Sequence, residues 1–199
     1  FNPLTSAYGV GLPAELHQTT WCSEMAIRFI TEDRDQPWLL SVNPFAPHPP
    51  FVPPQEYLDR YNPEDMPYPL FQESDIEHQK AFLAIDQQTV HATNPLIAPA
   101  ANDLDNFDPD IDRMGSIPPA SYDARLMKAC YYAEITLLDE QLGRIIDTLR
   151  ETNQLDNTLI IFTSDHGELL GDHGLLYKGC RFFEALTHVP LIISGPGFN

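Results

Sequence analysis

Residues 158–178 read TLIIFTSDHGELLGDHGLLYK, an apolar run followed by a dense polar one. The residues from Thr158 to Thr163 are β-branched and apolar, as expected of a fully buried strand. Asp165 and His166 follow at once, so the pattern places them at the carboxyl end of that strand. Ligands bind at this edge of open α/β sheets, and oxygen and imidazole donors together suit a divalent cation. The stretch therefore predicts a strand that leads into a metal site.

Other segments have the patterns of helices and strands in alternation. Apolar residues with a 3.6-residue period predict one long helix, for which Ser121 is the expected N-cap. Thr19 or Thr20 is expected to cap an earlier helix. The expected elements are helices over 19–30, 72–86 and 121–151 and strands over 38–43, 158–163 and 189–194. Strands joined by helical crossovers predict an α/β fold with a sheet that is parallel at least in part.

The segment 94–119 is rich in Pro, Asn and Asp and is interpreted as a surface insertion loop. Its acidic run resembles a calcium loop only superficially. Phe107 stands at the fifth position counted from Asp103, and Arg113 replaces the required glycine counted from Asp108. A solvated acidic loop is the expected structure.

Composition excludes several classes of function. The 199 residues carry a net charge of −18 with only 11 Lys and Arg, which argues against a nucleic-acid partner. Three widely spaced cysteines form neither a disulfide framework nor a zinc motif. No apolar run approaches the ~20 residues that span a bilayer. With 43% hydrophobic residues, the chain can form a substantial core.

Four segments resemble the sulfatase family of the alkaline phosphatase superfamily. Residues 163–178 together with VPLIISGPG at 189–197 resemble its metal-binding signature. Residues 38–57 are similar to a strand and the proline-rich substrate loop after it, and 131–146 are similar to the helix before the metal strand. The resemblance implies an α/β fold with a largely parallel or mixed sheet flanked by helices. It also implies that residues 1–199 are part of a single catalytic domain.

The resemblance assigns roles to four side chains. Asp165 and His166 match two ligands of one divalent metal ion, with calcium as the first expectation. Many members have Asn where His166 stands and bind calcium, whereas members with His at this position can use a softer ion, so manganese is the alternative. Lys178 matches the lysine that contacts the sulfate oxygens. His48 matches a histidine near the leaving-group oxygen that can donate a proton to it, so both are expected to bind substrate and to take part in catalysis.

Neighbouring polar residues have less definite roles. Asp172 and His173 either orient the metal ligand or the lysine, or have no role beyond the loop. Glu168 and Glu184 are expected to fix the loop.

The family's Cys/Ser-x-Pro-x-Arg motif, whose first residue becomes the formylglycine nucleophile, does not occur in residues 1–199. We therefore expect the chain to be an internal segment of a longer protein, with the formylglycine outside it. The isolated 199 residues are expected to show no sulfatase activity and weak metal affinity.

The leading functional hypothesis is a metal-dependent sulfuric ester hydrolase acting on a small-molecule or glycan sulfate ester. Two alternatives stay open at this point. One is a phosphonate monoester or phosphodiester hydrolase of the same superfamily, and the other is a non-catalytic acidic module that binds cations. The resemblance suggests a periplasmic, extracellular or lysosomal location.

Overall fold

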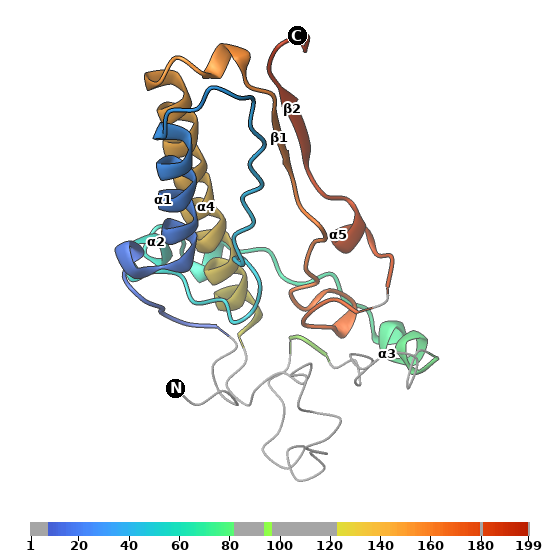
Figure 1. The fold of residues 1–199 in the computed structure, drawn as a ribbon. Coiled ribbons are helices and arrows are strands. Elements are labelled where there is room, and N and C mark those ends of the chain that lie inside the picture. Colours follow the sequence, from blue (N-terminus) through green and yellow to red (C-terminus); the bar gives the residue numbers. More distant parts are fainter. Residues whose placement is uncertain (1–7, 82–93, 97–122, 180, 199) are drawn as a thin grey trace, which may run out of the picture. The chain divides into compact units, whose positions relative to one another are not determined.

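A computed structural model describes residues 8–81, 94–96, 123–179 and 181–198 (Figure 1). Two compact units share the chain. Unit 1 comprises residues 1–7, 63–128 and 163–190, and unit 2 comprises 8–62, 129–162 and 191–199. Most of the expected loop 94–119 lies outside the described residues.

Helices account for most of the regular structure. The helices are α1 (Gln18–Thr31), α2 (Gln55–Leu58), α3 (Glu73–Lys80), α4 (Ala124–Glu151) and α5 (Glu184–Thr187), and the strands are β1 (Ile160–Thr163) and β2 (Leu191–Ser194). The helix expected over 72–86 begins as predicted, and its last part, 82–86, lies outside the described residues. The expected N-cap Ser121 also lies outside them.

Helices α1 and α4 lie side by side in unit 2 (Figure 1). The Ser23 hydroxyl of α1 donates to the Gln141 carbonyl of α4 at 3.3 Å. Buried Ala133 and Leu137 of α4 pack with Tyr57 of α2 into one apolar cluster. The 3.6-residue period of α4 produces this buried face, because residues three and four apart share one side of a helix.

The N-cap of α1 differs from the prediction. His17, rather than Thr19 or Thr20, precedes the helix, and its Nδ1 accepts the Thr19 N–H at 3.2 Å. Burial lowers the pKa of His17, which favours the neutral ring that this acceptor role requires. A sequence pattern that ranks caps by Ser, Thr, Asp and Asn does not anticipate an imidazole in this role.

The prediction of a strand over 38–43 is wrong. These residues pair with no strand in the described part of the chain, and Leu39 is 90% exposed. The segment is anchored through Trp38 instead, whose indole N–H donates to Gln154 Oε1 at 3.1 Å. An apolar pattern shows that a segment suits a strand, but a strand forms only against a partner.

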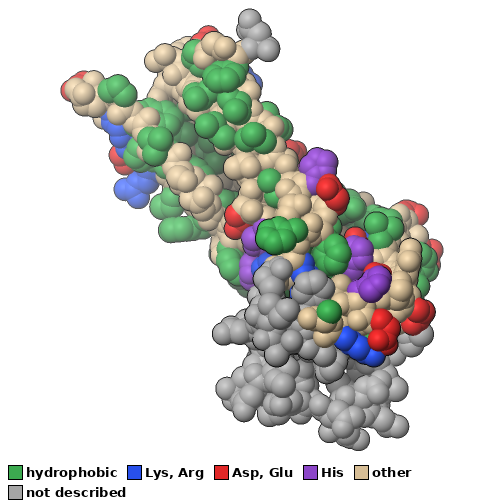
Figure 2. Space-filling model, turned by 90° about the vertical axis from the view of Figure 1, so that its right-hand side faces the viewer, with side chains coloured by type: hydrophobic (Ala, Val, Ile, Leu, Met, Phe, Trp, Pro, Cys, Tyr) green, Lys and Arg blue, Asp and Glu red, His purple; other side chains and the backbone are tan. Residues whose placement is uncertain are grey.

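The strands β1 and β2 form a two-stranded sheet in place of the expected larger one. They are shorter than predicted and run in opposite directions (Figure 1), so the described sheet does not confirm a parallel arrangement. Their apolar side chains are also exposed rather than buried, for instance Ile161 at 59% and Leu191 at 65%. Hydrophobic side chains gather over a broad area of the face shown in Figure 2.

The proline-rich segment 46–54 is held within unit 2 by α4 and by the N-terminal segment. Glu134 Oε1 on α4 accepts the Val52 N–H at 2.8 Å. On the other side, the Gly11 N–H donates to the Pro53 carbonyl at 2.8 Å. A Cβ at Gly11 would stand 1.8 Å from the Val52 carbonyl oxygen, so only glycine allows this close approach.

Among the described residues, no helix combines the length and the apolar composition that crossing a membrane requires.

Candidate active site

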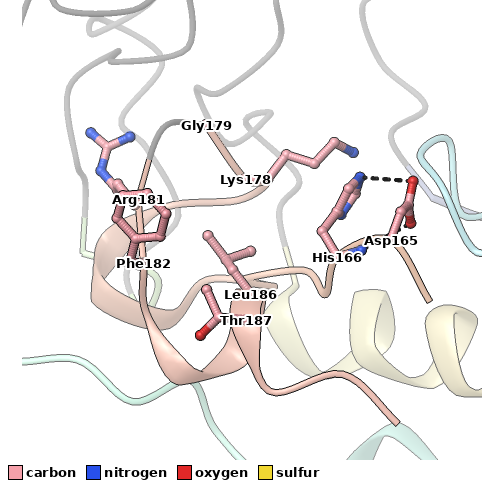
Figure 3. A pocket seen from close by; sticks show the side chains of 8 residues that line it. All are labelled: Asp165, His166, Lys178, Gly179, Arg181, Phe182, Leu186 and Thr187. Atoms are coloured by element: carbon pink, nitrogen blue, oxygen red, sulfur yellow. Dashed lines mark hydrogen bonds and ion pairs between the residues drawn. The ribbon is translucent and has the colours of Figure 1, made fainter. Parts of the chain in front are cut away.

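A pocket of about 370 Å³ lies in unit 1, directly after β1. Its lining includes Asp165, His166 and Lys178, three of the four side chains singled out in the sequence. Figure 3 shows Lys178 extending toward His166, with Asp165 beside the imidazole. The remaining lining residues are Gly179, Arg181, Phe182, Leu186 and Thr187. The pocket therefore combines an ammonium, an imidazole and a carboxylate.

A tight loop with a regular register brings the two ends of the motif together. Its backbone hydrogen bonds run from Leu169 N–H to the Tyr177 carbonyl at 3.2 Å, from Leu170 to Leu176 at 3.0 Å and from Gly171 to Leu175 at 2.8 Å. The turn at 171–174 uses positive φ angles at Gly171, His173 and Gly174. The next rung of this register places Glu168 opposite Lys178, whose Nζ lies 3.2 Å from Glu168 Oε2.

Gly167 sets the distance between the motif and α5. Its N–H donates to the Leu186 carbonyl at 2.9 Å. A Cβ at position 167 would stand 1.9 Å from the Ala185 carbonyl oxygen, so a larger residue would push α5 away. Behind the loop, Leu169, Leu175 and Leu186 form a small buried cluster. This packing fixes the backbone on which the pocket side chains stand.

The geometry of His166 leaves one nitrogen available to a metal. Its Nδ1 lies 2.7 Å from the Gly167 carbonyl, which can only accept, so Nδ1 carries the proton. The neutral ring then has its lone pair on Nε2, 3.8 Å from Asp165 Oδ2. A backbone carbonyl that fixes the tautomer in this way is common at metal-binding histidines. The donor set therefore fits a divalent ion.

Asp165 supplies the charged part of that pair. Its carboxylate is 87% exposed, and Oδ1 accepts the His166 N–H at 2.9 Å. Desolvation would raise the pKa of Asp165, but hydrogen bonds from the His166 backbone N–H and the Ser164 hydroxyl, with the charge that His166 carries when it is protonated, hold the pKa below its usual value. The carboxyl is therefore ionised under ordinary conditions. Within the described residues, no group of three or more His, Cys, Asp and Glu side chains is arranged to hold a metal.

His48 lies in unit 2, on the proline-rich segment. Its exposed ring packs on Phe45 with 4.4 Å between ring centroids. Nδ1 lies 2.8 Å from the Pro49 carbonyl and must therefore carry a proton. Donation of a second proton, from Nε2, requires the imidazolium form.

Asp172 and His173 do not contact the predicted metal pair or Lys178 in any described interaction. Asp172 Oδ1 accepts the Leu70 N–H at 2.9 Å and lies 3.6 Å from Lys128 Nζ. The His173 ring stacks on Phe183 at 3.9 Å. Both residues thus attach the turn to segments outside the loop, a structural role that neither of the two alternatives anticipated.

Sequence reasoning missed Arg181 as a pocket residue. Its side chain is buried, and Nε donates to Gln79 Oε1 of α3 at 2.7 Å. The nearest sequence indication is its place three residues beyond Lys178. Glu168 was expected only to fix the loop, and the structure pairs it with Lys178 directly. Burial raises the pKa of Glu168, while the charge of Lys178 opposes that rise.

A family model and similar proteins of known name both point to one family. The family model described as "Sulfatase" matches residues 16–198. A choline-sulfatase of Rhizobium meliloti is 31% identical over 99% of this chain and 36% of its own length. An arylsulfatase of Clostridium perfringens is 33% identical over 94% of this chain and 34% of its own.

Among solved structures, the phosphonate monoester hydrolase of Agrobacterium radiobacter superimposes with a TM-score of 0.69. It is 32% identical, and the match covers 94% of this chain and 34% of that one. The chain thus spans about a third of the length of the relatives it matches.

Proposed function

The chain belongs to the sulfatase family of the alkaline phosphatase superfamily, and we propose that the protein is a metal-dependent sulfuric ester hydrolase. One observation carries the proposal. In a chain that matches the family over residues 16–198, the Lys178 ammonium and the Asp165–His166 pair line the same pocket. An anionic ester that enters this pocket meets a cation and a pair of metal-binding groups that come from one loop of the chain.

Each side chain has a separate task in this proposal. Lys178 attracts the sulfate oxygens as a point charge where negative charge concentrates in the transition state. Asp165 and His166 Nε2 hold a divalent ion, calcium or manganese. When bound, such an ion polarises the ester oxygen and stabilises an alkoxide nucleophile. His48, protonated on both nitrogens, donates a proton to the leaving-group oxygen.

The nucleophile in this proposal is a formylglycine contributed by another part of the protein. Residues 1–199 contain no Cys/Ser-x-Pro-x-Arg motif from which it could form. The substrate is a small-molecule or glycan sulfate ester, in keeping with the choline-sulfatase and arylsulfatase relatives.

Hydrolysis of phosphonate monoesters is a second candidate function. The phosphonate monoester hydrolase structure is 32% identical over 94% of this chain, about as similar as the sulfatases. Sulfate and phosphonate monoesters present the pocket with similar tetrahedral anions. Turnover of an aryl sulfate and of phenyl phosphonate by the full-length protein, at matched concentrations, separates the two. Faster phosphonate turnover would contradict the sulfatase assignment.

The metal site is tested in the full-length protein with Asp165→Ala and His166→Ala combined. We expect this double variant to lose one equivalent of bound metal, measured by elemental analysis, together with ester turnover. The matched control is Glu184→Ala with His188→Ala, because these residues form another acid–imidazole pair of unit 1 and are 89% and 82% exposed. Metal content and turnover that survive the first double variant would contradict the assignment of Asp165 and His166 as metal ligands, whereas a wild-type protein that binds metal without any ester turnover would favour the non-catalytic module.

A further inference from the structure

Glu168 is buried beside the pocket without lining it. Its side chain is 4% exposed, while that of Lys178 is 17% exposed. Lys178 belongs to the pocket lining and Glu168 does not. The carboxylate is thus within reach of the ammonium but is not presented to a ligand. A residue in this position can act on a bound anion only through the lysine.

The ion pair follows from the register of the loop. Three backbone hydrogen bonds join residues 169–171 to residues 175–177 in antiparallel register. One step further along, the register of the backbone therefore places Glu168 opposite Lys178. Glu168 Oε1 makes no hydrogen bond with any described residue, so Lys178 is the side-chain partner that the described structure offers this carboxylate.

A lysine at an anion site needs such a partner for a physical reason. Its four-carbon stem gives the ammonium many rotamers, and most of them would place the charge away from the pocket. One hydrogen bond to Glu168 selects a rotamer and leaves two of the three ammonium N–H donors for a ligand. Because Glu168 does not line the pocket, its carboxylate makes no direct contact with an anion bound there.

We propose that Glu168 is a positioning residue that holds the Lys178 ammonium in the geometry required for the bound ester anion. This inference rests on the proposed function, because it assumes an anionic ester at Lys178. It assigns to the Glu of the Ser-Asp-His-Gly-Glu motif a role in substrate binding that depends entirely on the lysine ten residues later.

A double-mutant cycle in the full-length protein tests the inference. Glu168→Gln, which keeps the shape and removes the charge, is expected to lower kcat/KM by about 10²-fold, the usual effect of a misplaced catalytic group. In a Lys178→Met background the same substitution is expected to change kcat/KM less than about twofold, because its target is gone. Glu168→Asp, which restores the charge, should recover part of the loss. Glu77→Gln is the matched control, since it removes a carboxylate from an exposed ion pair with Lys80 in the same unit.

Two results would overturn the inference alone. The first is a Glu168→Gln protein with the kcat/KM of the wild type, and the second is a pair of losses that multiply in the double variant, as independent effects do. If Glu168→Gln does not fold, the cycle is run with Glu168→Asp, whose partial loss must likewise vanish in the Lys178→Met background. A wild-type protein that hydrolyses neither aryl sulfate nor phenyl phosphonate would overturn the proposed function, and this inference with it.

Discussion

Replacement of Glu134 by Gln should abolish a loss of folding stability that occurs as the pH rises. Glu134 is 2% exposed on α4, and its Oε1 accepts the Val52 N–H at 2.8 Å. Burial raises the pKa of Glu134 from 4.5 to about 8, and the Val52 hydrogen bond only partly opposes this. The folded protein therefore keeps a proton that the unfolded chain loses above about pH 4.5. The stabilising contribution of the protonated form is complete below that pH and is lost as the pH rises through 8.

The size of the effect follows from the same values. At about 1.4 kcal/mol per pKa unit, a rise from 4.5 to about 8 corresponds to about 5 kcal/mol of lost stability at pH 9, as an upper limit. Gln keeps an oxygen for the Val52 N–H and never ionises. The Glu134→Gln protein should therefore match the wild type near pH 4 and exceed it by several kcal/mol at pH 9.

Urea unfolding at a series of pH values from 4 to 9, followed by circular dichroism, measures this difference. Glu151→Gln is the control, because Glu151 is an exposed carboxylate at the end of the same helix. A gap between wild type and Glu134→Gln that stays constant with pH would refute the reasoning. So would a wild type that becomes relatively more stable as the pH rises.

Three further outcomes are expected. Gly11→Ala should destabilise the protein by about 2–3 kcal/mol, because the new Cβ would collide with the Val52 carbonyl. Gly143→Ala should instead stabilise it by about 0.5–1 kcal/mol, because no atom lies close to the new Cβ on this helix. Thermal unfolding measures both changes. His48→Gln should slow hydrolysis of esters with poor leaving groups far more than that of activated aryl esters, because only the former need the proton. An equal loss for both classes of ester would contradict the role of His48 as a proton donor.

Local sequence predicted the features that depend on neighbours along the chain. The long helix α4 was recognisable from its period, because an α-helix bonds residues four apart and needs no distant partner. Asp165, His166 and Lys178, which the sequence singled out together, also line one pocket. These residues lie within one loop whose register is set by local backbone hydrogen bonds.

Features that need a distant partner were predicted less well. Residues 38–43 have a strand-like composition but no strand beside them in the described structure. The attachment of Asp172 to Leu70 joins groups whose pairing has no signature in the sequence. The His17 cap is local, and the sequence missed it because imidazole is not one of the usual capping groups.

The sequence by itself determined the family, the helix α4 and the identity of the charged groups in the pocket. Only the tertiary structure decided which atoms of these groups are available. It turned Nδ1 of His166 to the Gly167 carbonyl, which leaves Nε2 open, and it buried Glu168 against Lys178. The physical reason is that a residue type specifies its donors and acceptors, whereas the fold specifies which of them are already paired.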